Sequence, residues 1–402
     1  MRNKESYDQN VQEVEGQEGC VHVLGIKKSS LLNDCVYFHV LSNFSLDLMH
    51  DILEGVVQYE IKLVLRYFSC EIHPSLFTLE NLNRRVASHS FGFTDRKNKP
   101  SYIKLNSTSN DIGQKAMQAW CFIRHLPFII GHDIKDDDPY WELLLKLLDC
   151  MDIIFSPRIT PGLIAQLRIL IEDHHNHFRS TFPDKKLLPK HHFMVHYPTC
   201  LENIGPLLHV WCMRYEAKHE YFCRVADTAR NFKNICKTVA KQHQMTQIYQ
   251  LKSDQPLENL EVGPGLSILC SYLEEICVET VVETIPGVTR FTEIFSANWV
   301  NLCGTIYQPL LLLCYDVKEL PMFGQIQHIL IYQENVYFVL QVWETLNYNS
   351  HYHAFSIKTK HPLCYVVKSQ GELVDHYPLD VVSSLLKSAH VQYVAPRHVL
   401  FK

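Results

Sequence analysis

The spacing of apolar residues changes once along this chain, and that change constrains its fold more than any single motif. Over most of the first 250 residues, apolar side chains recur every three or four positions, as they do in amphipathic helices. Beyond about residue 290 the chain switches to short runs rich in β-branched and aromatic residues, such as 336–343. The pattern predicts an α+β protein whose amino-terminal two thirds are mainly helical, followed by a small β-barrel or β-sandwich.

Composition shifts divide the chain into four expected segments. They are a polar lead with a short strand (1–40), a mainly helical domain (41–250), an acidic linker with a short helix (251–289) and a β-rich domain (290–402). In the first segment, the run CVYFHV at 35–40 is the expected strand. Residues 1 to about 20 are expected to be a flexible polar lead.

Within the helical segment, periodicity predicts five helices, over 45–68, 113–130, 140–155, 160–182 and 206–250. Ser45 or Asp47 can cap the first helix through a side-chain oxygen, and Pro161 suits the first turn of the fourth. Residues 81–113 are polar and rich in turn formers, so a loop-rich insertion is expected there. Residues 186–198 have prolines near both ends and are expected to connect two helices.

The overall charge limits how this chain could bind nucleic acid. The formal net charge is −5 and the pI is near 6.5, which argues against a surface coated in basic groups. Duplex binding depends on Lys and Arg contacts to phosphates, so any DNA contact must come from a local patch. Fourteen cysteines without a CxxC pair, together with a polar amino terminus, indicate free thiols in a reducing intracellular compartment.

Several classes of function have no support in the sequence. The longest apolar run, 306–317, is too short to cross a bilayer, so no membrane partner is expected. The sequence has no GxxxxGK, GxGxxG or GxSxG motif, and therefore no sign of a nucleotide, a cofactor or another small-molecule substrate.

One candidate for chemistry is a run of polar residues in the first predicted helix. Asp47, His50, Asp51 and Glu54 occur at positions i, i+3, i+4 and i+7, which lie on one face of a helix. Three carboxylates and an imidazole on two turns could bind a hard divalent ion or position one indirectly. The alternative is a solvated helix face with a capping residue.

The second candidate is the locally basic helix predicted over 206–250. Its candidate phosphate-binding residues are Arg214, Lys218, Arg224, Arg230, Lys233, Lys237 and Lys241. Glu216 lies among these cations, which favour its ionised form and suit a catalytic or metal-binding carboxylate. The alternative is a core helix with ion pairs such as Glu220–Arg224, buried along a stripe of apolar residues.

A third and weaker candidate is a transition-metal site formed by histidines. The residues that could contribute are His174, His175, His177, His191, His192 and His196, with Cys200, Cys212 and Cys223 as further additions. Their spacing matches no zinc template.

Four stretches in this order resemble conserved blocks of CACTA-like (EnSpm-type) DNA transposases, including animal copies. They are FSLDLMHDILEGVVQYEIKLVL with the GIKKSSLLN and YFHV lead-in upstream, KHHFMVHYP, the block GPLLHVWCMRYEAKHEYFCRVADTARNFKNICKTVAKQHQ, and MFGQIQHILIYQENVYFVLQVWETLNYNSHYHAFSI. The resemblance covers roughly residues 20–402.

The resemblance implies an RNase H-like nuclease fold with a helical insertion, and a nuclear location. In such enzymes two Asp and one further acid hold two divalent metal ions, Mg²⁺ or Mn²⁺, which clamp the attacking and leaving oxygens. Asp47 and His50 match the family's Asp-x-x-His motif. Glu216 is the chosen match for the final acid and Glu54 the competing one. Asp47 and Glu216 are therefore the metal-binding candidates.

The same resemblance implies that this chain is inactive by itself. In the family, the first two catalytic Asp lie well upstream of the Asp-x-x-His helix, whereas only 46 residues precede Asp47 here. Those residues include Asp8 and Asp34, but no run that resembles either catalytic strand. We expect a truncated transposase-derived protein without a cofactor in this form, and with Mg²⁺ or Mn²⁺ only if the site were complete.

Two alternatives stay open at this point. The chain could be a domesticated interaction protein, which binds DNA weakly through 205–244 or a protein partner through the β domain. It could also be a metal-dependent nuclease that works only when a second chain completes its site.

Overall fold

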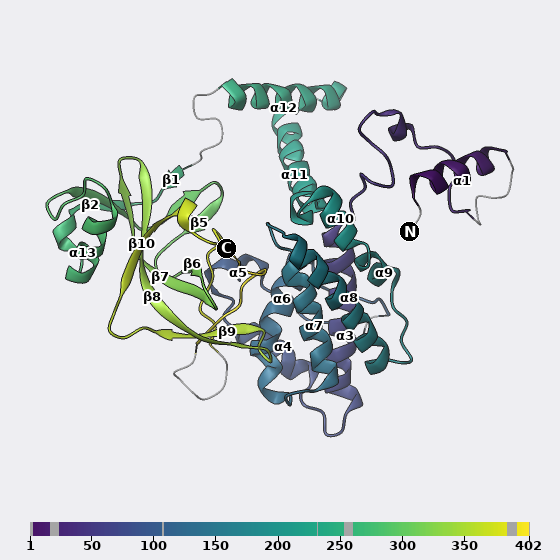
Figure 1. Cartoon of the computed structure of the whole chain (residues 1–402), viewed down its shortest axis with the longest axis horizontal. Coiled ribbons are helices and arrows are strands. Elements are labelled where there is room, and N and C mark those ends of the chain that lie inside the picture. Colours follow the sequence, from purple (N-terminus) through teal and green to yellow (C-terminus); the bar gives the residue numbers. More distant parts are fainter. Residues whose placement is uncertain are drawn as a thin grey trace.

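The computed structural model describes residues 3–16, 24–106, 108–230, 232–252, 260–383 and 392–401. The predicted α+β class is confirmed, because helices up to residue 252 are followed by antiparallel sheets. The helical body and the β part lie side by side, and α11 and α12 project from the body (Figure 1). None of the helices in the described ranges is long and apolar enough to cross a membrane.

The helical part is built from α-helices and two π-helical segments. They are α1 (Lys4–Gly16), η2 (Met49–Val56), α3 (Val57–Arg66), η3 (Tyr67–Glu71), α4 (Leu79–Ser88), α5 (Gly92–Asp95), α6 (Ala116–Ile130), α7 (Pro139–Ile154), α8 (Pro161–Thr181), α9 (Pro189–Met194), α10 (Tyr197–Ile204), α11 (Cys212–Ala229) and α12 (Ile235–Lys252). One large apolar cluster joins them, and α6 lies inside it, with apolar residues buried along most of its length.

The helices predicted over 113–130, 140–155 and 160–182 are confirmed as α6, α7 and α8, and their starts have clear local causes. The Asp138 side chain accepts a 3.0 Å hydrogen bond from the Tyr140 amide at the start of α7. Thr160 does the same for Leu163 at 3.3 Å, and Pro161 occupies the first turn of α8 as expected. The helix predicted over 45–68 is also present, but its first two turns are π-helical.

Five local predictions in this part are wrong. The helix predicted over 206–250 is divided into α11 and α12 at Arg230, which has a positive φ of 47°. Residues 35–40 form turns after a 3₁₀ helix (Leu31–Asp34) instead of a strand. The polar lead contains α1, whose Tyr7 and Val11 pack on Ile26. The predicted insertion 81–113 begins with α4 and α5, and the predicted connector 186–198 contains α9. In the last three cases a few apolar contacts stabilise a helix within a mainly polar segment.

The β part contains one small and one large sheet. The small sheet has the order β1 (Leu260–Val262), β4 (Val300–Leu302), β5 (Thr305–Tyr307). The large one has the order β11 (Gln392–Val394), β9 (Ala354–Thr359), β8 (Asn335–Asn349), β7 (Pro321–Tyr332), β3 (Glu293–Ala297), β2 (Gly265–Leu269), with β10 (Tyr365–Ser369) on β8 and β6 (Leu312–Val317) on β7. The short helix expected before residue 289 is α13 (Glu275–Thr284). Residues 253–259 of the acidic linker lie outside the described residues, and the part that follows forms β1 and β2.

The expected β-barrel is wrong, because the large sheet does not close on itself within the described residues. β7 and β8 are long, and each has a bulge, between Ile326 and His328 in the β7–β8 ladder and between Thr345 and Asn347 in the β8–β9 ladder. A bulge bends a strand, so β8 pairs with β10 along its first half and with β9 along its second. Gln333 and Glu334 form the turn between β7 and β8.

The β part is fastened to the helical body by hydrogen bonds from its loops and its carboxyl-terminal segment. The Trp141 indole donates to the His351 carbonyl at 3.1 Å, and His353 contacts Asp152 at 3.0 Å. Asp380 accepts the amides of Phe93 and Thr94, at 2.7 and 2.9 Å, at the start of α5. These contacts hold the two parts together.

Candidate functional site

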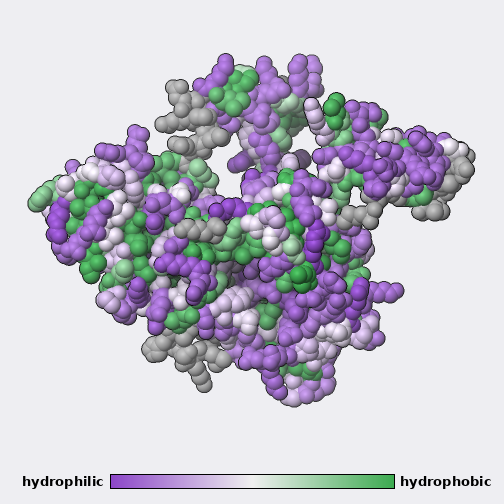
Figure 2. Space-filling model, viewed as in Figure 1, coloured by the Kyte–Doolittle hydropathy of each residue, from purple (hydrophilic) through white to green (hydrophobic). Residues whose placement is uncertain are grey.

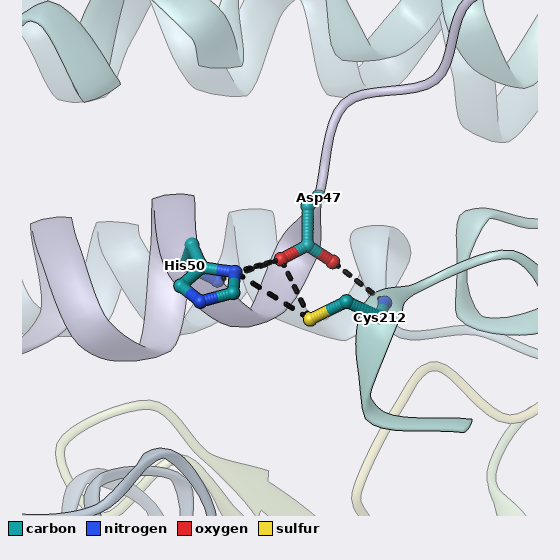
Figure 3. Close-up of side chains that lie close together, drawn as sticks. All are labelled: Asp47, His50 and Cys212. Carbon is teal, nitrogen blue, oxygen red and sulfur yellow. Dashed lines mark hydrogen bonds and ion pairs between the residues drawn. The ribbon is translucent and has the colours of Figure 1, made fainter. Parts of the chain in front are cut away.

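The start of η2 and the start of α11 meet at a group of three side chains, Asp47, His50 and Cys212 (Figure 3). Asp47 Oδ2 lies 2.5 Å from His50 Nδ1 and 2.9 Å from Cys212 Sγ. Asp47 Oδ1 accepts the Cys212 backbone amide at 2.8 Å. The remaining pair, Cys212 Sγ and His50 Nδ1, is 3.5 Å apart. We call these three residues the Asp–His–Cys cluster.

Local structure explains why Asp47 and His50 face the same point. Asp47 directly precedes the helix, and its Oδ2 accepts the His50 amide at 3.1 Å, so Asp47 and not Ser45 is the capping residue. Lys190 Nζ from α9 donates to the His50 carbonyl at 2.6 Å and holds this turn from outside. π-Helical turns such as η2 are uncommon and occur often at functional sites.

The electrostatics of the cluster favour a carboxylate beside a neutral thiol. Burial raises the pKa of Asp47, but hydrogen bonds from Cys212 and His50 outweigh this and leave the pKa below its usual value. Burial raises the pKa of the Cys212 thiol to about 12, with further contributions from the bond to Asp47 and from its charge. The thiol is therefore a hydrogen-bond donor here and not an activated nucleophile.

The other two predicted catalytic residues lie around the same point. Glu216 follows Cys212 by one turn of α11, and Glu54 follows His50 by about one turn of η2. Both are exposed, and the charge of each helps to raise the pKa of Cys212. The structure therefore brings Asp47, His50, Glu54 and Glu216 to one end of the helical body, around Cys212.

Asp51 does not share the exposed polar face predicted for it. Its side chain is 8% exposed and accepts a hydrogen bond from the Tyr197 hydroxyl at 3.4 Å. Burial raises the pKa of Asp51, while Lys190 opposes that rise. Asp51 is buried because α9 and α10 cover it, with the Tyr197 hydroxyl on its carboxylate and Lys190 nearby.

The donor atoms of the cluster do not suit the pair of Mg²⁺ or Mn²⁺ ions that the family resemblance implies. Mg²⁺ requires oxygen ligands in octahedral geometry and is rarely held beside a thiol. Both oxygens of Asp47 already accept hydrogen bonds from Cys212, and Glu54 and Glu216 are exposed to solvent. We therefore derive no catalytic step through such ions.

The seven predicted phosphate-binding residues all lie on exposed surface of the projecting α11, α12 and the turn between them. The core-helix alternative for this stretch is wrong, because neither helix has a buried residue. Lys218 Nζ lies 4.4 Å from the ring centre of Tyr221. Figure 2 shows mainly hydrophilic surface here, with a hydrophobic patch on α12; Ile248 and Leu251 are among its exposed apolar residues.

The six histidines predicted as a third candidate do not converge on one site, although the ring centres of His174, His175 and His191 lie 5.4–6.4 Å apart. His174 and His191 instead contact the two oxygens of Glu60, at 3.0 and 2.9 Å, and all three side chains are completely buried. His177 lies 2.7 Å from the Pro139 carbonyl, and His192 pairs with His196 at the surface. The spacing of Glu60, four residues after Val56 and four before Val64, places it in the apolar stripe of α3. A charged residue at an apolar-stripe position is the feature of the sequence that could have predicted this buried charge.

A second buried polar cluster centres on Asp95. Asp95 Oδ2 accepts a 2.6 Å bond from Arg124 and lies 3.4 Å from His125, while Oδ1 lies 3.3 Å from Arg397 near the carboxyl terminus. Burial opposes ionisation, but the two guanidinium groups and the hydrogen bond from His125 hold the pKa of Asp95 far below its usual value. The cluster therefore joins the helical body to the last residues of the chain.

Comparison with known proteins gives no relative. The chain matches no protein-family model, no curated protein and no solved structure.

Proposed function

We propose that this chain is a CACTA-like transposase-derived protein that binds DNA through α11 and α12 and does not cut DNA by itself. Its helical part derives, in this proposal, from an RNase H-like transposase with a helical insertion, and its place of action is the nucleus. The observation that carries the proposal is the meeting of the two most family-like stretches, through Asp47 and Cys212, beside the basic helices.

The DNA-binding part of the proposal rests on charge and shape. Residues Arg214, Lys218, Arg224, Arg230, Lys233, Lys237 and Lys241 are all exposed on one projecting helical unit, although the whole chain carries a net charge of −5. Such a local concentration of cations can neutralise several phosphates without a basic overall composition. The acids Glu216, Glu220 and Asp227 lie on the same unit, so affinity is expected only at low to moderate salt.

Fluorescence polarisation with a labelled DNA duplex over a range of salt concentrations tests this part. The triple charge reversal Arg230→Glu, Lys233→Glu, Lys237→Glu should weaken binding at least tenfold and reduce the salt slope by about 3, near one unit for each lost phosphate contact. The matched control reverses Lys135, Lys185 and Lys360, three exposed lysines elsewhere. Equal losses in both variants, or no binding at low salt, would reject DNA binding by α11 and α12.

The proposal that the chain does not cut DNA by itself rests on the metal-ligand atoms around Asp47, which do not suit a pair of Mg²⁺ or Mn²⁺ ions. A nicking and strand-transfer assay with Mn²⁺ on supercoiled and element-end DNA should give no product above background. Robust turnover that Glu216→Ala abolishes would reject this part and favour a nuclease. Turnover only after a second chain is added would favour a site completed in trans.

A further inference from the structure

Three chemically different donors meet in the Asp–His–Cys cluster. The carboxylate Oδ2 of Asp47, the imidazole Nδ1 of His50 and the thiol Sγ of Cys212 all lie within 4.8 Å of one another. Asp47 and Cys212 are 165 positions apart in the sequence, so the fold and not local spacing creates the arrangement. Oxygen, nitrogen and sulfur from two rigid elements form a typical ligand set for zinc.

The second group of this kind in the described part of the chain, Asp95, Cys121 and His125, is a poor competitor. All three residues are buried, and the guanidinium groups of Arg124 and Arg397 already occupy the oxygens of Asp95. A cation entering there would meet two fixed positive charges. Among the described residues, no lysine or arginine pairs with the side chains of the Asp–His–Cys cluster, since Lys190 bonds the backbone carbonyl of His50. The cluster is open to solvent at His50, whose side chain is 52% exposed.

We propose that Asp47, His50 and Cys212 bind a single divalent transition-metal ion such as Zn²⁺. Such an ion prefers a ligand set that includes thiolate and imidazole to one made of oxygen atoms alone. With Zn–S near 2.3 Å and Zn–N near 2.0–2.1 Å, a tetrahedral site places sulfur and nitrogen about 3.5 Å apart. Cys212 Sγ and His50 Nδ1 are already 3.5 Å apart. The two distances to Asp47, 2.9 and 2.5 Å, are shorter because hydrogen bonds now link those atoms.

Ion binding replaces those hydrogen bonds with metal–ligand bonds, and every proton that is displaced has a stated destination. The Cys212 thiol loses its proton to solvent and binds as thiolate, and the imidazole of His50 binds through Nδ1 with its proton on Nε2. Asp47 Oδ2 then ligates the ion, while Oδ1 keeps the bond from the Cys212 amide and fixes the carboxylate orientation. Each ligand atom needs to move by less than about 1 Å for this geometry.

A fourth ligand is available on either side of the cluster. Glu216 lies four residues after Cys212 on α11, and Glu54 lies four residues after His50 on η2, so each is near its neighbouring ligand. Both are close enough for their charge to affect Cys212. Either carboxylate, or a water molecule, completes four-coordination. The ion would fix the base of α11 to the helical body whether or not α11 and α12 bind DNA.

Titration of the reduced full-length protein with Co²⁺ tests the proposal directly. We expect one equivalent to bind, with a near-ultraviolet thiolate-to-cobalt charge-transfer band and visible bands of tetrahedral intensity. Zn²⁺ should displace the Co²⁺ stoichiometrically, and millimolar Mg²⁺ should not. Cys212→Ser should abolish the charge-transfer band, and Asp47→Asn and His50→Gln should each weaken binding at least tenfold. The matched control, Cys223→Ser, changes an exposed thiol on the same helix and should leave the spectrum unchanged.

A second measurement on the wild-type chain keeps the proposal falsifiable if a variant fails to fold. Zn²⁺ should slow alkylation of Cys212 by iodoacetamide at least tenfold, with mass spectrometry assigning the modified residue, while Cys223 reacts as before. The absence of a charge-transfer band would overturn the proposal, as would a band that persists in Cys212→Ser or Zn²⁺ protection that does not include Cys212.

Discussion

Cys212 donates two hydrogen bonds to Asp47, one from its backbone amide to Oδ1 at 2.8 Å and one from its thiol to Oδ2 at 2.9 Å. Asp47 also accepts the His50 amide at the start of η2. One carboxylate therefore caps a helix and fastens the base of α11 to it. Asp47 thus holds the start of α11, a helix that has no buried residue and packs on the main core through partly buried side chains such as Met213.

We expect Asp47→Ala to lower the free energy of unfolding by about 1–2 kcal/mol, because it removes a helix cap together with the bonds to Cys212. Urea unfolding followed by circular dichroism measures this change. The matched control is Ser45→Ala, since Ser45 also precedes the helix but only donates to the Leu46 carbonyl. A control variant as destabilised as Asp47→Ala would contradict the capping role of Asp47.

Asp95→Ala should destabilise the chain far more, by about 3–5 kcal/mol, because it leaves the buried Arg124 and the Arg397 guanidinium without their carboxylate. The control is Asp133→Ala, which removes the partner of Arg85 at a partly exposed site and should cost about 1 kcal/mol or less. The urea midpoints of the two variants give the comparison. Equal urea midpoints for the two variants would show that the buried ion pairs of Asp95 stabilise the chain no more than the partly exposed pair of Asp133.

Much of the helical part could be predicted from the sequence, because amphipathic periodicity reports burial on one face directly. The periodicity of α6, α7 and α8 fixed their ends to within a few residues. The π-helical turns of η2 could not be predicted in this way, because apolar periodicity does not distinguish them from α-helical turns. The burial of Asp51 depends on Tyr197, 146 positions away in the sequence. Helix α1 could not be predicted from amphipathic periodicity either, because only three buried residues stabilise this mainly polar helix.

The candidate site was only partly predictable for a different reason. Asp47, His50 and Glu54 are close in sequence, so helical spacing places them together, and the family resemblance adds Glu216. Cys212 occupies the centre of the group only because the fold joins residues 165 positions apart. A single sequence contains no spacing that records such a contact. The family resemblance pointed to the stretch around Cys212 but not to its thiol.

Glu60→Gln is expected to destabilise the chain by about 3 kcal/mol at neutral pH, because Glu60 is a completely buried carboxylate between His174 and His191. Burial opposes its ionisation, but the two imidazoles outweigh burial and lower the pKa of Glu60 from 4.5 to about 2. A lowered pKa in the folded state means stability that is present above pH 4.5 and lost as the pH falls toward 2.

The urea midpoints of wild type and Glu60→Gln should therefore converge as the pH is lowered from 7 toward 3. Glu54→Gln is the control, because Glu54 is exposed on the same continuous helical segment and its loss should change neither the midpoint nor its pH dependence appreciably. A difference between wild type and Glu60→Gln that stays constant over this range would contradict a charged Glu60.

The β7–β8 turn should accept a stabilising substitution. Gln333 and Glu334 both have positive φ, 49° and 64°, a conformation that costs an ordinary L residue energy. Replacing the pair by Asn-Gly, the preferred sequence for this turn, should raise the free energy of unfolding by about 0.5–1 kcal/mol. Thermal unfolding of this variant beside Gln327→Gly, which puts glycine inside β7 and should destabilise, gives the test. A variant no more stable than wild type would contradict the strain assigned to the turn.

His353 should make the contact between the β part and the helical body sensitive to pH. It lies 3.0 Å from Asp152 and 3.7 Å from Asp149, both on α7, and 2.8 Å from the Tyr348 hydroxyl of β8. Burial opposes its protonation, but Asp152 and then Asp149 outweigh burial and raise the pKa of His353 above 6.5. A raised pKa in the folded state gives stability that is complete below pH 6.5 and is lost as the pH rises through the folded-state value.

We therefore expect His353→Gln to destabilise the chain most at pH 6 and progressively less toward pH 9. The informative quantity is the difference between wild type and variant in urea midpoint, because other buried histidines, such as His398, titrate in both proteins and cancel. His219→Gln, at an exposed position of α11, is the control and should show no such trend. A difference that grows with pH would mean that His353 is neutral in the folded state and that Asp152 accepts its N–H as an ordinary hydrogen bond.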